Sequence, residues 1–360
     1  MKKVNIVTIY DPNPNYGNRL QNYAVQCVLE KRGFCVETIS FEKKFFSGKN
    51  LIKILLHKLT AYKIFPNGDY WKATEKRVCA FDRFNKKFIR TKRIKSIKQI
   101  GNADYYVVGS DQVWNPEWYS DCPMKKEMYL LSFAESKKRV CMSPSFGVES
   151  LPQAWCQYFK EQLTQFPKLS VREAAGAHII KQLTGRSAEV LVDPTMLLSK
   201  SDWEKISRKP QKVNCDCGYI LTYFIGKKTE EQEQYIKNIA KSNKLEVYNL
   251  LDPLNSALYQ VDPSEFIYMI EHARIVFTDS FHACVFSILF EKPFQVFKRN
   301  GKEGNMFSRI ENILEKFSLQ RKNYENRNMN DLFECDYSKA KDVLLYEREK
   351  ANRFLNESFE

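Results

Sequence analysis

Residues 4–39 decide the fold, and they read VNIVTIYDPNPNYGNRLQNYAVQCVLEKRGFCVETI. Residues 4–9 form a mostly apolar run that predicts a buried β-strand, and residues 20–31 repeat apolar side chains at helical spacing. Gly33 ends the helical pattern, and residues 34–39 supply a second strand. A strand, a polar loop, a helix and a strand in this order usually open a parallel, doubly wound sheet.

The same rhythm continues along the chain and divides it. Further apolar runs predict strands at residues 105–108, 140–143, 169–171 and 190–192. After a break at residues 194–210, the alternation restarts with runs at residues 219–225, 245–250, 275–278 and 293–297. We therefore predict an α/β fold of two Rossmann-like domains, residues 1–205 and 206–335, and a helix over residues 336–360 that packs back on the first domain.

Composition excludes several classes of protein. A chain of 360 residues is longer than one hydrophobic core usually organises, which favours two domains. No stretch approaches the roughly 18 apolar residues of a membrane span, and the apolar run near the N-terminus is too short for a secretion signal, so we expect a soluble cytoplasmic protein. Ten scattered cysteines then predict reduced thiols, and Cys215 with Cys217 lacks the further ligands of a zinc site, so no metal is expected.

The loop after the first strand contains the motif Asn15-Tyr16-Gly17-Asn18 where the first helix begins. Free backbone N–H groups and the positive end of the helix dipole favour an anion at such a position. Gly17 and Asn18 are therefore candidate binding residues. An ordinary capping turn is the alternative, because the motif is not the glycine fingerprint of dinucleotide sites.

Residues 109–115, GSDQVWN, follow the next strong strand. An indole face can stack on a sugar ring while acid, amide and hydroxyl groups bind its hydroxyls, so this composition suits a sugar. A strand-end turn with a buried tryptophan is the alternative interpretation. The candidate residues of this segment are Ser110, Asp111, Gln112, Trp114 and Asn115.

Arg172, in the segment SVRE at residues 170–173, stands where a strand ends and a helix begins. Its guanidinium can bind a carboxylate or phosphate at two points, with helix N–H groups adding to the same anion. A structural role is the alternative, either beside Glu173 or in a salt bridge. The segment Asp193-Pro194-Thr195 is interpreted as a turn at the edge of the domain.

His282 follows a buried strand that ends in the polar residues Thr278-Asp279-Ser280, and it falls in the first turn of the next helix. A single histidine is more often structural than catalytic. This one, however, would face the crevice beyond the strand ends, where bound anions favour its protonated form. His282 is therefore the candidate general acid.

These motifs, in this order over roughly residues 4–315, resemble the polysaccharide pyruvyl transferase family. The resemblance implies two facing Rossmann-like domains similar to the B-type glycosyltransferases, phosphoenolpyruvate as the donor substrate, and no metal or organic cofactor. The product would be a cyclic pyruvate ketal on a sugar of a bacterial capsule or exopolysaccharide. The motifs that carry it are residues 15–21, 109–115, 143–147, 170–173, 193–195 and 278–283.

The resemblance also implies roles for individual residues. Arg172 would bind the carboxylate or phosphate of the donor, and His282 would protonate its methylene carbon. The resemblance does not assign the base on the acceptor side, for which we choose Asp111. The other implied binding residues are Gly17, Asn18, Ser110, Gln112, Trp114, Asn115, Ser145, Asp279 and Ser280.

Ser280 departs from the family pattern, because several relatives carry an arginine at this position. Phosphoenolpyruvate carries close to three negative charges, so another cation is needed. We expect Arg309, or Lys298 and Arg299, to replace the missing arginine.

The net charge of +14 is concentrated in residues 41–100, which hold 17 Lys and Arg against 4 Asp and Glu. Apolar spacing predicts two basic amphipathic helices in this insertion, over residues 52–62 and 78–88. An acceptor carried on a lipid diphosphate would bring the enzyme to an anionic membrane face, where each basic residue contributes about 1 kcal/mol. A solvated charged insertion is the alternative.

Two other functions compete with pyruvyl transfer. A nucleotide-sugar-dependent glycosyltransferase of B-type fold would share the architecture, but the sequence shows no convincing nucleotide site. A nucleic-acid-binding protein would use the basic insertion. We expect no nucleic-acid partner, because the helical spacing of the aromatic residues there indicates packing against the protein.

Overall fold

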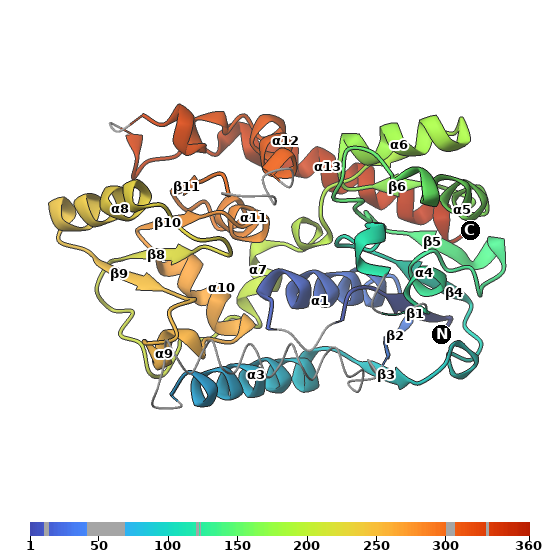
Figure 1. The fold of residues 1–360 in the computed structure, drawn as a ribbon, viewed down its shortest axis with the longest axis horizontal. Coiled ribbons are helices and arrows are strands. Elements are labelled where there is room, and N and C mark those ends of the chain that lie inside the picture. Colours follow the sequence, from blue (N-terminus) through green and yellow to red (C-terminus); the bar gives the residue numbers. More distant parts are fainter. Residues whose placement is uncertain (11–13, 42–68, 120–121, 123, 300–306, 329–330) are drawn as a thin grey trace.

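The computed structural model describes residues 1–10, 14–41, 69–119, 122, 124–299, 307–328 and 331–360. Figure 1 shows two lobes, each built around its own parallel sheet with helices packed against it. The predicted α/β fold of two Rossmann-like domains is confirmed. Within the described residues, no helix is both long enough and apolar enough to span a bilayer.

The first sheet has the strand order β3-β2-β1-β4-β5, and all its neighbouring strands run parallel. Its central strand β1 is almost fully buried, in keeping with its apolar sequence. The strands are β1 (Lys3–Val7), β2 (Cys35–Phe41), β3 (Thr91–Ile94), β4 (Tyr105–Val108) and β5 (Arg139–Cys141). The helices of this part are α1 (Tyr16–Glu30), α3 (Asp69–Phe88), α4 (Met124–Tyr129), α5 (Gln153–Leu163) and α6 (Ala174–Thr184).

Helix α1 begins earlier than the apolar spacing predicts, at Tyr16, because Asn15 caps it. The Asn15 side chain accepts a hydrogen bond from the Asn18 N–H at 3.1 Å. The helix runs between the two lobes, and the Tyr16 hydroxyl at its first turn donates to the carbonyl of Val261 in the second lobe. The N-terminal end of α1 therefore faces the second domain.

The described part of the basic insertion is not entirely helical. Its second predicted helix lies within α3, whereas the first, residues 52–62, lies outside the described residues. The expectation of an insertion over residues 41–100 needs correction, because residues 91–94 form β3, the edge strand of the first sheet. This strand is short and carries Lys92 and Arg93, so periodicity does not reveal it.

The second sheet has the order β11-β10-β8-β9, again with parallel neighbours, and its strands match the four predicted runs. The strands are β8 (Tyr219–Tyr223), β9 (Glu246–Asn249), β10 (Ile275–Thr278) and β11 (Phe294–Val296). The helices of this part are α7 (Lys200–Glu204), α8 (Glu230–Asn243), α9 (Ser256–Tyr259), α10 (Pro263–His272), α11 (Phe281–Leu289) and α12 (Ser308–Lys316). Short 3-10 helices lie at Ile97–Gln99, Pro116–Tyr119, Ser136–Lys138, Pro194–Leu197, Gln320–Lys322 and Tyr324–Asn326.

Two of the predicted strands do not extend the first sheet. Within the described residues, strand β6 (Ser170–Val171) pairs only with strand β7 (Glu189–Val190), and the two form a separate two-stranded sheet. Side-chain hydrogen bonds from Ser170 take the place of a backbone ladder to β5. Its hydroxyl donates to the carbonyl of Cys141 at 2.8 Å and accepts from the N–H of Ser143 at 3.2 Å.

Helix α13 (Ser338–Ser358) runs back along the first domain (Figure 1). The Tyr105 hydroxyl donates to the Phe359 carbonyl at 2.8 Å, and Lys350 donates to the Val190 carbonyl at 2.9 Å. The exact domain limits at residues 205 and 335 stay predictions.

In each sheet the order of the strands reverses beside the strand that comes first in the sequence. The reversal lies between β1 and β4 in the first sheet and between β8 and β10 in the second. Loops that leave a parallel sheet at such a point diverge and open a crevice beyond the carboxyl ends of the strands. The described segments at these points are residues 8–10, 14–18 and 109–115 in the first domain, and residues 224–229 and 279–282 in the second.

Candidate functional site

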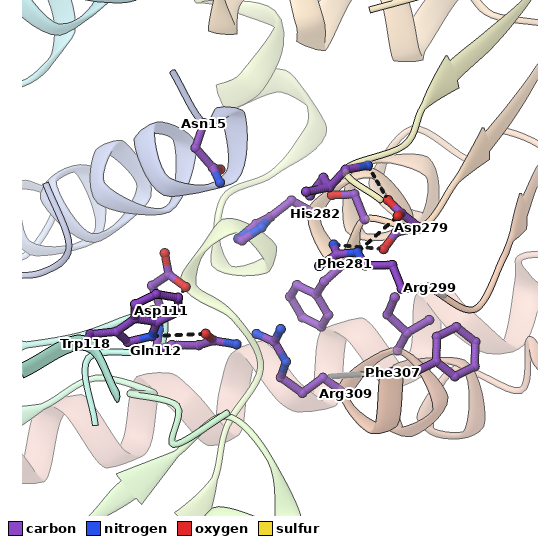
Figure 2. Close-up of a pocket in the computed structure, with 13 residues that line it drawn as sticks. Asn15, Asp111, Gln112, Trp118, Asp279, Phe281, His282, Arg299, Phe307 and Arg309 are labelled. Carbon is purple, nitrogen blue, oxygen red and sulfur yellow. Dashed lines mark hydrogen bonds and ion pairs between the residues drawn. The ribbon is translucent and has the colours of Figure 1, made fainter. Parts of the chain in front are cut away.

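A cavity of about 240 Å³ opens where these loops meet (Figure 2). The first domain supplies a carboxylate, amides and an indole to its wall, and the second domain supplies an imidazole and two guanidinium groups. The lining residues are Asn15, Asp111, Gln112, Trp118, Ile225, Asp279, Ser280, Phe281, His282, Arg299, Phe307, Arg309 and Ile310.

His282 stands in the first turn of α11 and lines this cavity, as the sequence predicts. The face of its imidazole lies against Gly17, where an added Cβ would be 2.0 Å from Nδ1, 2.4 Å from Cγ and 2.6 Å from Cε1. The other ring nitrogen, Nε2, is buried 3.7 Å from Oδ2 of Asp193 and has no hydrogen-bond partner among the described residues. Gly17 thus contributes by having no side chain.

Asp193 is the site residue that sequence reasoning missed. Its carboxylate is fully buried, and it accepts hydrogen bonds from Arg172 at 2.7 Å, from the Ser110 hydroxyl at 3.3 Å and from the Thr195 hydroxyl at 2.7 Å. Burial alone would raise the pKa of Asp193, but His282, Arg172 and Thr195 hold that pKa well below its usual range. The predicted turn is present, since Oδ1 of Asp193 caps a 3-10 helix. The other oxygen, Oδ2, accepts from Arg172 and faces His282.

Arg172 is also buried, with only 2% of its side chain exposed. It lies between Asp193 and Asp111, whose Oδ1 is 4.0 Å away, and its Nε and one terminal nitrogen find no hydrogen-bond partner in the described part of the chain. Burial would lower the pKa of the guanidinium, but the two aspartates raise it above its ordinary value. The alternative of a salt bridge is confirmed, but its partner is Asp193 and not Glu173, which accepts from the Phe146 N–H at 2.8 Å.

Arg172 lines a second cavity of about 290 Å³, whose other walls are mainly apolar. Phe281 and Arg309 line both cavities and separate them. The Phe281 ring centre is 4.8 Å from the Arg172 guanidinium carbon and 6.0 Å from that of Arg309. The Phe281 ring therefore lies beside both arginines at the border of the two cavities.

Three cations were expected to replace the arginine missing at Ser280, and the structure separates them. Arg309 points into the cavity (Figure 2), and burial together with the neighbouring Arg172 lowers its pKa to about 10, so it stays charged at neutral pH. Arg299 also lines the cavity but donates to Asp279 at 3.0 Å. Lys298 is exposed and lies outside the lining.

Asp279 and Ser280 lie in the wall of the cavity, at the end of β10. The Asp279 carboxylate accepts from the N–H groups of Ile225 and Gly226, each at 2.7 Å, and so ties the end of β8 to the end of β10. Ser280 is buried at the start of α11, and its own N–H donates to the hydroxyl of Thr278 at 3.0 Å. Asp279 mainly braces the site, and Ser280 is part of its floor.

Asp111 reaches the opposite wall from the turn after β4, with a left-handed backbone at φ 68°. Such an angle is uncommon outside glycine and is tolerated best by Asn and Asp. Asn18 donates to its Oδ2 at 3.2 Å. The Gln112 amide lies between Trp118 Nε1, 3.3 Å away, and Arg309, whose terminal nitrogens lie 2.8 and 3.1 Å from the amide oxygen when the amide is turned toward them.

The prediction that Trp114 stacks on a sugar is wrong. Its ring is fully buried, its indole N–H donates to the Tyr129 carbonyl at 2.9 Å, and it packs against Phe146. Trp118, four residues further on, is 43% exposed and lines the cavity. The sequence contains both tryptophans, and only the packing of the turn decides which one faces the site.

Three other candidates from the sequence shape the turn instead of lining the cavity. Ser110 is buried and its hydroxyl donates to the Ser143 carbonyl at 2.8 Å, and buried Asn115 accepts from the Glu117 N–H at 3.0 Å. The N–H of buried Ser145 donates to the Asp111 carbonyl at 2.8 Å. The expectation that these three bind substrate directly is corrected accordingly, because none of them lines this cavity and their hydrogen bonds lie within or beside the turn that carries Asp111 and Gln112.

A third cavity of about 270 Å³ adjoins the first on the side of the first domain, and Asn18 lines it. It shares Asn15, Asp111, Gln112 and Trp118 with the first cavity. Across the described residues, no three metal-ligating side chains gather at one point, and the ten cysteines are free thiols.

Each domain has a parallel sheet, and the cavity between the two domains contains an imidazole, two arginines and a carboxylate. The fold and the site therefore define a two-domain α/β protein with an anion-attracting interdomain site. The chain belongs to the polysaccharide pyruvyl transferase family, whose model matches residues 15–300. The family implies a transferase. No curated protein matches the sequence.

Solved structures similar to this chain include Anabaena Alr3699/HepE in complex with UDP and glucose, at 12% sequence identity and a TM-score of 0.44, with 99% of each chain covered. Another is a putative UDP-N-acetylglucosamine 2-epimerase from Listeria monocytogenes, at 12% identity and a TM-score of 0.44, covering 98% of this chain and 97% of the other.

Proposed function

We propose that this protein transfers the pyruvyl group of phosphoenolpyruvate to a pair of sugar hydroxyls and forms a cyclic ketal, in the synthesis of a bacterial capsule or exopolysaccharide. Membership of the polysaccharide pyruvyl transferase family supports this proposal. The observation that carries it is the cavity itself, in which His282, Arg299 and Arg309 stand opposite Asp111 and Trp118. Cations on one wall suit a small trianion, and an exposed indole with a carboxylate on the other suits a sugar.

Arg309 is the proposed main cation for the donor, because it is charged, points into the cavity and lies at the border with Arg172. Arg172 would bind the donor carboxylate or phosphate once the Phe281 side chain has turned. Two nitrogens of Arg172 have no hydrogen-bond partner among the described residues, which favours this role. Trp118 takes the place of Trp114 as the aromatic platform for the acceptor.

In the proposed reaction, His282 gives a proton to the methylene carbon of the donor, and the electron pair of the C=C bond forms the new C–H bond. The adjacent carbon becomes oxocarbenium-like and accepts a sugar hydroxyl oxygen, whose proton goes to Asp111. The C–O bond to phosphate then breaks, and phosphate leaves. A second hydroxyl of the same sugar adds to this carbon and closes the ketal, and its proton returns to the neutral His282.

Calorimetry with phosphoenolpyruvate tests the proposal. We expect saturable binding to the wild type, binding weakened at least tenfold in Arg309→Ala and Arg172→Ala, and binding retained in His282→Ala, since protonation is separate from donor affinity. Lys298→Ala is the matched control, because Lys298 lies outside the lining. Binding of nucleotide sugars without any response to phosphoenolpyruvate would overturn the proposal in favour of a glycosyltransferase.

A lipid-diphosphate-linked acceptor and an anionic membrane surface are part of the same proposal. In the described part of the insertion, α3 exposes Lys72, Lys76, Lys86 and Lys87 on one side while its apolar residues face the protein. Flotation with neutral and with anionic vesicles tests this, and equal recovery from both would contradict it.

A further inference from the structure

The imidazole of His282 is held by three segments that are far apart in the chain. His282 itself belongs to α11 of the second domain, its ring face rests on Gly17 at the start of α1, and its Nε2 faces Asp193 at the end of the first domain. The ring therefore has a defined orientation before any substrate binds, and its two nitrogens have different surroundings.

Nε2 faces the protein interior. It is buried, it is 3.7 Å from the Asp193 carboxylate, and it has no hydrogen-bond partner among the residues that the structure describes. Gly17 covers the ring face over Nδ1, as the 2.0, 2.4 and 2.6 Å approaches to Nδ1, Cγ and Cε1 show. A group over the face leaves the in-plane direction of Nδ1 open, so Nδ1 is the nitrogen available to the cavity.

Asp193 is itself fixed in position. Thr195 donates twice to its Oδ1, through its N–H at 3.0 Å and its hydroxyl at 2.7 Å, and Arg172 donates to Oδ2 at 2.7 Å. Oδ2 is therefore a fixed, buried negative group shared between Arg172 and His282. A carboxylate in this place sets the tautomer of an imidazole and stabilises its protonated form.

We propose that Asp193 is a positioning residue for His282: it holds the proton on Nε2, and Nδ1 is the nitrogen that delivers a proton into the cavity. The part of this proposal that concerns where the proton goes rests on the proposed function. The tautomer of His282, by contrast, is a property of the free protein. In the transfer, the Nδ1–H bond breaks and the C–H bond to the donor's methylene carbon forms, while the neutral imidazole keeps its Nε2–H.

The charged groups around the imidazole come from several elements. Asp193 is the nearest, and Arg172 lies behind it. The others that line the two adjoining cavities are Asp111, Glu173, Asp279, Arg299, Arg309, Glu315 and Lys316. Only Asp193 is placed at ion-pair distance from His282 in the described part of the chain.

The first test is 15N NMR of the histidine side chains in the full-length free protein, without substrate. Four histidines give a simple spectrum, and His282→Gln assigns the signal. We expect the neutral His282 to be the Nε2–H tautomer in the wild type, and a mixture of tautomers in Asp193→Asn, which keeps the shape but loses the charge. A neutral Nδ1–H tautomer, or an unchanged spectrum in Asp193→Asn, would overturn the proposal.

The second test is kinetic and uses phosphate release from phosphoenolpyruvate, with methyl hexopyranosides that carry free hydroxyl pairs as acceptors. We expect Asp193→Asn to lower kcat about 100-fold with little change in KM for the donor, because the imidazole loses the group that orients it. Asp202→Asn is the control, since Asp202 belongs to the capping box of α7, away from the cavities.

The two tests separate the two proposals. Absence of turnover in the wild type would contradict the proposed function while the NMR result still decides the role of Asp193. If Asp193→Asn fails to fold, Thr195→Val moves the carboxylate without removing its charge, and a partial loss of the Nε2–H preference is then expected. Full retention of that preference in Thr195→Val would count against positioning by Asp193.

Discussion

Replacing Gly17 by alanine should separate catalysis from stability. The new Cβ would lie 2.0 Å from Nδ1 of His282, whereas ordinary contacts begin near 3.4 Å, so the imidazole must move by roughly 1.4 Å. A displacement of about 1 Å at a reacting group can cost about 100-fold in rate, and we expect a loss of kcat of this size. Gly17 lies in α1, where alanine is favoured over glycine by about 1 kcal/mol.

The free energy of unfolding should therefore change by no more than about 1 kcal/mol, because His282 can turn into the cavity and relieve the contact. The measurement pairs phosphate release from phosphoenolpyruvate with denaturant unfolding. Gly176→Ala is the matched control, since its Cβ would meet only side-chain carbons of Phe146 and Val171, at 3.1 to 3.3 Å, away from His282. Wild-type turnover in Gly17→Ala would refute the inference that the imidazole is held against α1.

Three further predictions follow from the same contacts. Trp118→Ala should raise the KM of the acceptor about tenfold and change the free energy of unfolding by no more than about 0.5 kcal/mol. Trp114→Ala should instead lower the free energy of unfolding by about 3 to 5 kcal/mol. The opposite pattern would restore Trp114 as the binding residue. The depressed pKa of Asp193 contributes stability that is present above its unfolded pKa of about 3.9 and is lost as the pH falls through its folded pKa. Below about pH 4 the wild type should therefore lose more stability than Asp193→Asn. Acid titrations of the free energy of unfolding measure this difference. Burial raises the pKa of Cys141 to about 11, so alkylation at pH 8 should label exposed Cys217 well before Cys141, and equal rates by mass spectrometry would contradict that burial.

Local sequence carries most of the fold of this protein. The apolar runs at residues 4–9 and 275–278 become central strands because continuous apolar side chains can only be accommodated between two layers of helices. Residues 170–171 show the limit of this argument. Their apolar run predicts a strand, and they form one, but side-chain hydrogen bonds from Ser170 replace the ladder that would join it to the first sheet.

Local sequence also indicates where the site lies. His282 and Asp111 were recognised because reactive side chains at strand ends converge on one edge of a parallel sheet, and both line the cavity. Arg309 was expected as a replacement for the arginine that the family pattern has at Ser280, and it lines the cavity too. The family motifs add the order of these segments. Their chemical roles remain proposals, which the experiments above address.

Only the tertiary structure decided the partners within the site. Trp114 and Trp118 are four residues apart and chemically identical, and the packing against Phe146 buries the first and leaves the second in the wall. Asp193 resembles an ordinary capping residue in sequence, yet it meets Arg172, 21 residues away, and His282, 89 residues away. Periodicity reports which face of a segment is buried, whereas a side chain's partner depends on how distant segments pack, and that information is distributed over the whole chain.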